Sequence, residues 1–177
     1  FLDSPMAVTA TQLYDRSVEE YDQDMKEMVA AGDHPLEPDY LTFIRDSNQS
    51  KELNSRTGPM IIIAGSGMAN GGRVIHHLKH RLPDPSTLVL FVGFQGSGTL
   101  GRQILDGAEV VEIHREAIPV RAEVRRITSL SAHADQADIM KWLSFFESPP
   151  KHTFIVHGEP ESQDVLAAKL REELGWE

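Results

Sequence analysis

The chain has 177 residues, a length that suits one domain or two small domains packed together. Its 17 basic and 27 acidic residues give a formal net charge of −10, which excludes nucleic-acid binding through overall charge and leaves only a local site for RNA or DNA. There is no cysteine, which excludes thiol catalysis and Cys-based zinc sites and favours a reducing, cytoplasmic location, and no apolar run approaches the ~20 residues that span a membrane.

The N-terminal part is predicted to be mainly helical. Phe1 stands directly before what resembles an interior motif, so we expect the chain to be a piece of a longer protein. Ser4 and Pro5 have the residue types of a helix cap and a first helical position, and the helix is predicted to continue to Gly32. A short strand over residues 41–44 and a short polar helix from near Ser47 are predicted to follow.

The middle of the chain contains an approximate repeat of strand, glycine-rich loop and helix. Residues 60–64 and 88–92 are unbroken apolar runs, typical of strands buried on both faces. They lead into the loops Gly65-Ser66-Gly67-Met68-Ala69-Asn70-Gly71-Gly72 and Gly93-Phe94-Gln95-Gly96-Ser97-Gly98-Thr99. One helix is predicted over residues 73–81 after the first loop, and a short helix that ends near Gly107 is predicted after the second loop. This repeat predicts an α/β fold in which the two units lie side by side in a parallel sheet, with both loops at one edge.

The pattern changes after Gly107. Residues 110–114 and 120–127 alternate apolar and charged side chains, which predicts half-buried antiparallel strands. A helix, a strand over residues 152–156 and a last amphipathic helix are predicted beyond them. We therefore place a domain boundary near Gly107, which separates residues 1–107 from residues 108–177.

The glycine-rich loops are candidate phosphate-binding sites. Backbone amides and hydroxyls at helix starts suit phosphate, and the candidates are Ser66, Gly67, Ser97 and Gly98. The alternative is that the loops are only tight turns that require positive φ angles. Residues 96–101 also have the spacing of a dinucleotide-binding motif. The predicted strand ends too early and the following helix is too short for that motif, so a dinucleotide module ranks third.

Histidines form two candidate groups. His76 and His80 are one helical turn apart and, with His77, have a spacing that is compatible with a metal site. Zinc enzymes with this spacing have a Glu after the first His, which is missing here, so an exposed amphipathic helix face explains the three histidines better. His133 and His157 each follow an apolar segment in a small-residue turn, where Ser131 and Asp135 could orient the ring of His133 and His157 could bind a metal. The alternative is that both histidines only form local hydrogen bonds within turns, because a zinc site needs three or four ligands.

Five motifs in order resemble the β-CASP ribonucleases. They are Leu2-Asp3-Ser4-Pro5-Met6, Gly65-Ser66-Gly67-Met68, Gly96-Ser97-Gly98-Thr99-Leu100, Ser129-Leu130-Ser131-Ala132-His133-Ala134-Asp135 and Val156-His157-Gly158-Glu159. These ribonucleases have the metallo-β-lactamase fold and include the endonuclease of mRNA 3′-end formation and its bacterial relatives. The resemblance implies that residues 1–107 are a partial β-CASP domain. Residues 108–177 would then be the returning C-terminal strands and helices of a metallo-β-lactamase αββα fold.

The resemblance also implies roles for individual residues. His133 falls on the motif whose His contacts the scissile phosphate and assists proton transfer to the leaving oxygen. His157 falls on the motif whose His is a ligand of one of two zinc ions, which polarise the phosphodiester and generate the attacking hydroxide. Ser129 and Ser131, in the motif of His133, are candidate contacts to phosphate or RNA.

The family's His-x-His-x-Asp-His motif, its further His and bridging Asp ligands and its first β-CASP acidic motif are absent from the sequence. They would lie upstream, so the missing N-terminal metallo-β-lactamase half is an expected partner. This piece alone is expected to hold no catalytic zinc and to be inactive. The alternative function is a non-catalytic RNA-binding or scaffold member of the family, and a homo-oligomer stays open. Exonuclease or endonuclease action is undecided.

Overall fold

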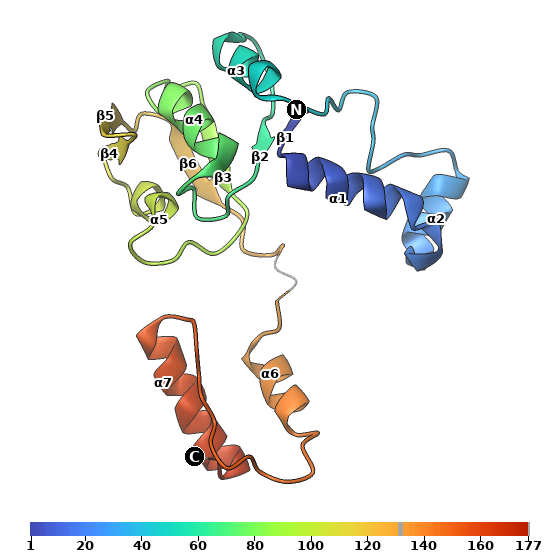
Figure 1. Ribbon diagram of the computed structural model, residues 1–177, viewed down its shortest axis with the longest axis vertical. Coiled ribbons are helices and arrows are strands. Elements are labelled where there is room, and N and C mark those ends of the chain that lie inside the picture. The colour runs from blue at the N-terminus through green and yellow to red at the C-terminus, as the bar shows by residue number, and fades with distance from the viewer. Residues whose placement is uncertain (131–132, 177) are drawn as a thin grey trace. The chain divides into compact units, whose positions relative to one another are not determined.

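Residues 1–130 and 133–176 are described by a computed structural model (Figure 1). The described chain divides into two units, Phe1–Arg126 and Ile127–Glu177. The first unit combines helices with two parallel strand pairs and one antiparallel pair, which confirms the predicted α/β class. Within the described residues, every helix is too short or too polar to cross a membrane. The assignment of residues 1–107 and 108–177 to two domains stays a prediction.

The chain begins with a short parallel strand pair. Strand β1 (Leu2–Asp3) pairs with β2 (Ile63–Ala64), and Leu2 also bridges Phe43, the remnant of the strand predicted over residues 41–44. Ser4 caps helix α1 (Pro5–Arg16) as predicted, since its hydroxyl oxygen accepts a hydrogen bond from the Ala7 amide.

The single helix predicted from Pro5 to Gly32 is wrong. Helix α1 ends at Arg16, and a 3₁₀ turn (Val18–Glu20) separates it from α2 (Gln23–Ala30). Two local hydrogen bonds cause the break: the Ser17 hydroxyl donates to the Leu13 carbonyl, and Asp22 starts a new helix by accepting from the Met25 amide. The predicted stop at Gly32, whose φ is 92°, is confirmed.

Helices α3 and α4 are close to their predicted positions. Asp46 caps α3 (Ser47–Ser55) by accepting from the Asn48 and Gln49 amides. Helix α4 (Gly72–Arg81) packs its apolar side into the main core of the first unit. That core also draws on β3 (Leu88–Phe91), α5 (Leu100–Leu105), β4 (Val110–Ile113) and β5 (Glu116–Pro119).

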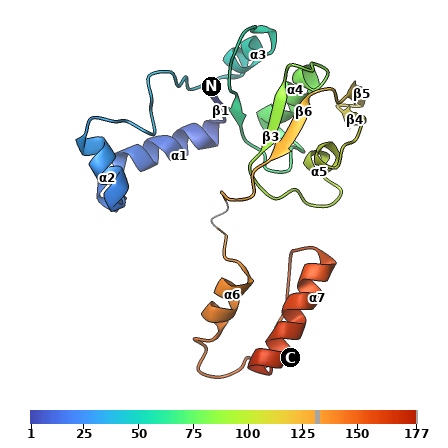
Figure 2. The ribbon, with the colours of Figure 1, turned by 180° about the vertical axis from the view of Figure 1, so that it is seen from behind.

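Strand pairing differs from the predicted pattern in two ways. Strand β3 pairs with β6 (Glu123–Arg126) in parallel, while β2 pairs with β1, so the two predicted βα strands are not neighbours in one sheet (Figure 2). Residues 120–127 were expected to be antiparallel. Instead, β4 and β5 form a hairpin through His114 and Arg115, whose φ angles of 52° and 65° suit a tight two-residue turn. The chain beyond Pro119 is thereby released to pair with β3.

The apolar strands are not buried on both faces, contrary to prediction. Ile63 is 55% exposed, Leu88 is 50% exposed and Val92 is 56% exposed. Only one side of β3 meets the core, where Phe91 is buried and Val89 is partly buried. The continuous apolar run therefore carries an uncovered face within this unit.

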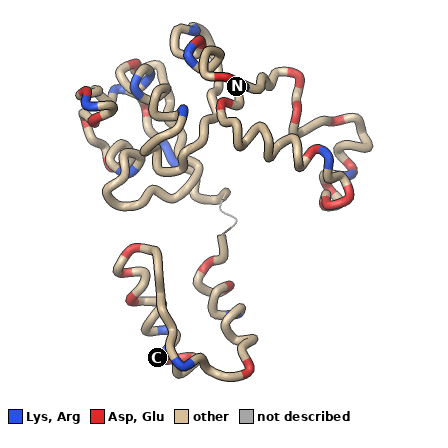
Figure 3. Tube along the Cα trace, in the orientation of Figure 1, with Lys and Arg blue, Asp and Glu red and all other residues tan. Residues whose placement is uncertain are grey.

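The second unit is built around two helices. Asp135 and Asp138 form a capping box at the start of α6 (Gln136–Leu143), and α7 (Pro160–Lys169) continues into a π-helical turn (Leu170–Leu174). The buried residues are Met140, Leu170 and Trp176. Acidic and basic positions occur in both units (Figure 3).

The strand predicted over residues 152–156 is wrong. Ile155 packs against the core of the second unit, but Phe154 and Val156 are 83% and 73% exposed. The segment alternates as a strand does, yet no strand is assigned to it or to any other described residue of the unit. A strand needs a hydrogen-bonding neighbour, and the sequence of one segment cannot supply it.

Candidate functional site

The two glycine-rich loops meet in the first unit. The Gly101 amide donates to the Met68 carbonyl at 3.1 Å, and the Leu100 amide donates to Oδ1 of Asn70 at 2.8 Å. We call residues 65–72 and 93–101 the glycine junction. The two loops are therefore in direct contact, but the expectation that they share one edge of a single parallel sheet is wrong, because their strands belong to different sheets.

Gln95 fastens the glycine junction from inside. Gln95 is only 2% exposed, and its side-chain Nε2 donates hydrogen bonds to the carbonyls of Gly67 at 2.8 Å and Phe94 at 3.0 Å. A Cβ at Gly101 would lie 2.9 Å from Cδ of Gln95 and 3.2 Å from the Met68 carbonyl oxygen, so only glycine fits there. Sequence reasoning missed Gln95. A long polar side chain between glycines was the available signal.

The exposed parts of the junction are the predicted phosphate contacts. Ser66, Gly67, Ser97 and Gly98 are all exposed. Ser66 has a φ of 103° and Gly98 a φ of 76°, so the loops contain tight turns, as the simpler interpretation requires. Helix α4 has no side-chain cap at its N-terminus, whereas Thr99 caps the six-residue α5. Phosphate binding at these residues stays a prediction.

The dinucleotide interpretation loses its geometric basis. Its last glycine, Gly101, is buried against Gln95 rather than open to a ligand. The following helix, α5, has only six residues. The glycine spacing of residues 96–101 is explained by packing within the junction.

A buried charged cluster supports the same unit. Asp3 is 0% exposed and accepts hydrogen bonds at 2.6 Å from Ser50 Oγ of α3 and from Arg73 Nη1 and His77 Nε2 of α4. Burial by itself would raise the pKa of Asp3, but the hydrogen bonds from Ser50, His77 and Arg73 outweigh burial and hold it below its ordinary value. The cluster ties β1, α3 and α4 together.

The expected exposed face of α4 is therefore only partly present. His76 and His80 are exposed, but His77 is 6% exposed and its Nδ1 lies 2.9 Å from Oδ1 of Asn54. Sequence reasoning missed this role because Asp3 lies 74 positions before His77.

His133 and His157 both lie in the second unit and are exposed. His157 has a φ of 64° and directly precedes α7, where Nε2 of Gln163 donates to the His157 and Gly158 carbonyls. Asp135, expected to orient His133, caps α6 through its Oδ1. Ser129 is exposed, and Ser131 lies outside the described residues. The roles of these residues stay predictions.

A zinc site requires several donor side chains that converge on one point. Among the described residues, no three His, Asp or Glu side chains converge as a metal site. His157 offers an imidazole of the right type, but a zinc site takes three or four ligands. The residues that the structure describes therefore do not fit zinc unaided, and the metal role of His157 stays a prediction.

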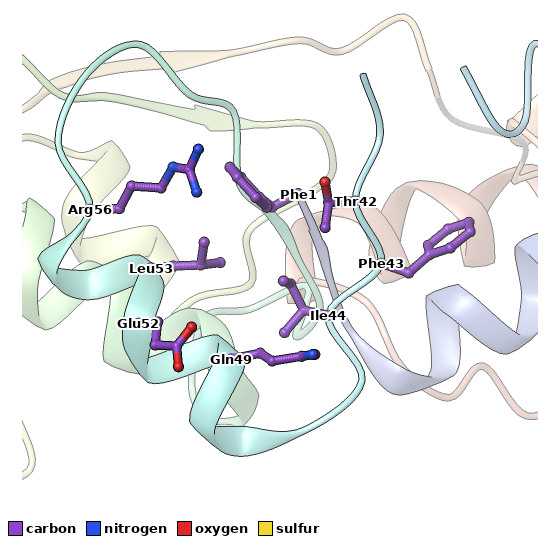
Figure 4. A pocket seen from close by; sticks show the side chains of 8 residues that line it. All are labelled: Phe1, Thr42, Phe43, Ile44, Gln49, Glu52, Leu53 and Arg56. Atoms are coloured by element: carbon purple, nitrogen blue, oxygen red, sulfur yellow. The ribbon is translucent and has the colours of Figure 1, made fainter. Parts of the chain in front are cut away.

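A cavity of about 410 Å³ lies between α3 and the segment around Phe43 (Figure 4). In this cavity the Arg56 guanidinium lies 4.9 Å from the centre of the Phe1 ring. Leu53 and Ile44 form the apolar side of the cavity. Of the described residues that line this cavity, none is a histidine. It offers no imidazole for proton transfer.

Two domain models match the sequence. The Beta-Casp domain model matches residues 1–104, and the model described as a Zn-dependent metallo-hydrolase RNA specificity domain matches residues 117–177.

Curated relatives align with nearly the whole chain. Ribonuclease TTHA0252 of Thermus thermophilus is 40% identical over 170 residues, which are 96% of this chain and 38% of that protein. Transcription termination factor FttA of Pyrococcus abyssi is 30% identical over 99% of this chain and 28% of its own. The Methanocaldococcus jannaschii FttA is 29% identical over 90% of this chain and 26% of its own. The chain thus spans less than two fifths of the length of these relatives.

Proposed function

Since the chain belongs to the β-CASP family of metallo-hydrolases that act in RNA metabolism, we propose that it is part of a zinc-dependent ribonuclease that hydrolyses RNA phosphodiester bonds. The observation that carries this proposal is the 40% identity to a ribonuclease over 96% of the chain. The absence of cysteine supports a cytoplasmic location for the enzyme.

The glycine junction is proposed to hold the RNA backbone. Ser66, Gly67, Ser97 and Gly98 are exposed on loops that Gln95 fixes from within. Amides and hydroxyls held in this way bind phosphate without a basic surface, which suits a protein with a net charge of −10. Ser129 and Ser131 are proposed to contact phosphate in the same manner beside His133.

The two exposed histidines are given different tasks. His133 is proposed to donate a proton to the departing oxygen of the cleaved phosphodiester. His157 is proposed to bind zinc through its imidazole, the other ligands coming from outside this chain. When bound, zinc supplies Lewis-acid chemistry at the phosphodiester.

A second candidate is a non-catalytic RNA-binding or scaffold role within a larger assembly. The observation that favours it is the 30% identity over 99% of the chain to a protein named transcription termination factor. Binding of RNA without cleavage by the complete protein would support this candidate over the ribonuclease.

The test uses the complete protein, with RNA cleavage and zinc content measured together. His133→Ala should lower turnover by ~10²–10⁴-fold, the usual contribution of a general acid, and leave zinc content unchanged. His157→Ala should lower both. The matched control is His152→Ala, another exposed histidine of the same unit, which should change neither quantity. Full turnover in His133→Ala would overturn the assignment of His133.

The chain of 177 residues offers a second test. Because its described residues provide one zinc donor, the purified chain should not cleave RNA. Cleavage by this chain alone, abolished by a chelator, would contradict the proposed division of ligands.

A further inference from the structure

A second cavity, of about 620 Å³, is lined by residues of α3 and α4, two helices that pack against each other. It is separate from the exposed residues of the glycine junction. Its lining consists of polar and basic residues: Ser47, Ser50, Lys51, Asn54, Ser55, Arg73, His76 and His80. None of these lining residues carries a carboxylate, which is unusual in a chain with more acidic than basic residues.

The basic groups of this cavity differ in exposure and in pairing. Arg73 forms its inner part, where its guanidinium is neutralised by the buried Asp3. Lys51 stands on the exposed side of α3 and makes no ion pair with any carboxylate in the described part of the chain. Figure 3 shows basic residues on both α3 and α4. The charge available to a ligand therefore comes from Lys51 and, once protonated, from His76 and His80.

His76 lies among other basic side chains. Its ring lies 4.8 Å from that of His114, at the turn of the β4–β5 hairpin. Burial and the neighbouring charges lower the pKa of His76; the charged neighbours, in falling order of effect, are His114, His77, His80 and Lys79. Glu116 is bound to Lys79 at 2.6 Å, and its carboxylate also lies close enough to His114 and His80 to interact with them electrostatically. An anion in the cavity would relieve this repulsion.

We propose that the cavity between α3 and α4 binds a phosphate group of an RNA strand, as a contact site apart from the glycine junction. Lysine, serine and asparagine side chains are the groups that commonly hold backbone phosphates, and here they line one cavity with two histidines. The RNA source of the phosphate rests on the proposed function, whereas the phosphate chemistry rests on the cavity alone.

The first test compares Lys51→Gln with Lys26→Gln, an exposed lysine on α2 that serves as the matched control. Binding of a single-stranded RNA oligonucleotide is measured by fluorescence anisotropy over a range of salt concentrations. Removing one phosphate contact should reduce the salt slope by ~0.7 and weaken binding about fourfold at ~0.15 M salt. Lys26→Gln should leave the slope unchanged. Equal slopes in the unmodified chain and Lys51→Gln would overturn the RNA contact.

The second test uses inorganic phosphate and a mononucleotide, followed by the NMR signals of the histidine rings. Both should shift the ring signals of His76 and His80, because these rings line the cavity that the anion would enter. Ring signals that stay unmoved throughout the titration would overturn the site.

The two tests together separate the proposals. If phosphate and mononucleotide bind but the RNA slope does not depend on Lys51, the RNA source is wrong and the ligand is a small phosphorylated molecule. If RNA cleavage by the complete protein fails while the Lys51-dependent RNA slope is present, the ribonuclease proposal fails and the contact site stands.

Discussion

The glycine junction of the first unit and the His157 turn of the second unit are fixed in different ways. The junction is closed by hydrogen bonds between its loops, with the buried amide of Gln95 inside it. At the turn, the hydrogen bonds from Gln163 reach only backbone carbonyls, and the ring of His157 is exposed. The glycine junction is therefore held by contacts of its own buried side chain and backbone, whereas the His157 turn holds only its backbone and leaves the imidazole exposed.

This difference separates stability from chemistry. Substitutions that disturb the junction or the Asp3 cluster should lower the free energy of unfolding of the first unit, because buried partners lose their contacts. Substitution of an exposed imidazole removes a functional group but few contacts, so it should affect zinc or RNA chemistry and leave the fold intact.

The two units can be followed separately by their own chromophores. Both tryptophans, Trp142 and Trp176, lie in the second unit, and all three tyrosines, Tyr14, Tyr21 and Tyr40, lie in the first. Tryptophan fluorescence, excited at the long-wavelength edge where tyrosine does not absorb, therefore reports unfolding of the second unit. Tyrosine emission, read on the short-wavelength side of the tryptophan emission, reports on the first unit.

The largest loss of stability is expected for Asp3→Ala. It removes the counter-charge of Arg73 and the partner of buried His77, so the first unit should lose ~3–5 kcal/mol, as when one partner of a buried ion pair is removed. Urea unfolding measures this loss. Asp33→Ala, at an exposed position, is the control and should change stability by less than ~0.5 kcal/mol. A similar loss in both variants would contradict the special role of Asp3.

The same cluster predicts a dependence of stability on pH. The pKa of Asp3 is lower in the folded chain than its ordinary value of 3.8. Its stabilising contribution is therefore fully present above pH 3.8 and is lost as the pH falls through the lower, folded pKa. Unfolding of the first unit measured between neutral and acidic pH should show this loss, and Asp3→Asn should flatten it. An unchanged acid limb in Asp3→Asn would assign the effect to other carboxylates.

A smaller loss is expected at the glycine junction itself. In Gly101→Ala the new methyl group meets Gln95 and the Met68 carbonyl, so the first unit should lose ~1–3 kcal/mol through overpacking. Gly93→Ala is the matched control, because a Cβ there has no heavy atom within 4 Å. Thermal unfolding of the two variants side by side checks the difference. Equal stabilities would show that the junction can yield.

Local signals allowed part of this structure to be predicted from the sequence. The Ser4 cap, the stop at Gly32 and the polar helix from Ser47 depend on residues a few positions apart, and all three are present. The break at Ser17 is also local, but its hydrogen bond to Leu13 competes with an apolar stripe that favoured one long helix. The glycine loops were found because glycine spacing is itself a local pattern.

What could not be predicted depends on long-range pairing. The apolar run of β3 predicts that this strand is buried, but it does not predict that β6 is its neighbour. Likewise, the sequence around Asp3 does not predict its contact with His77. The same limit applied to residues 152–156, where alternation predicted a strand without naming a partner. For the candidate site, sequence patterns identified the exposed loop and turn residues, whereas Gln95, which holds the junction, emerged only from its contacts.

The smallest effect is expected in the second unit. His157→Ala removes an exposed ring whose backbone turn is still held by Gln163, so the free energy of unfolding should change by less than ~0.5 kcal/mol. Leu170→Ala, in the buried cluster with Met140 and Trp176, is the positive control and should cost ~2–5 kcal/mol. Tryptophan fluorescence during urea unfolding measures both variants. A loss in His157→Ala as large as that in Leu170→Ala would mean that the ring is a structural element of its turn, and the contrast between the two units would then fail.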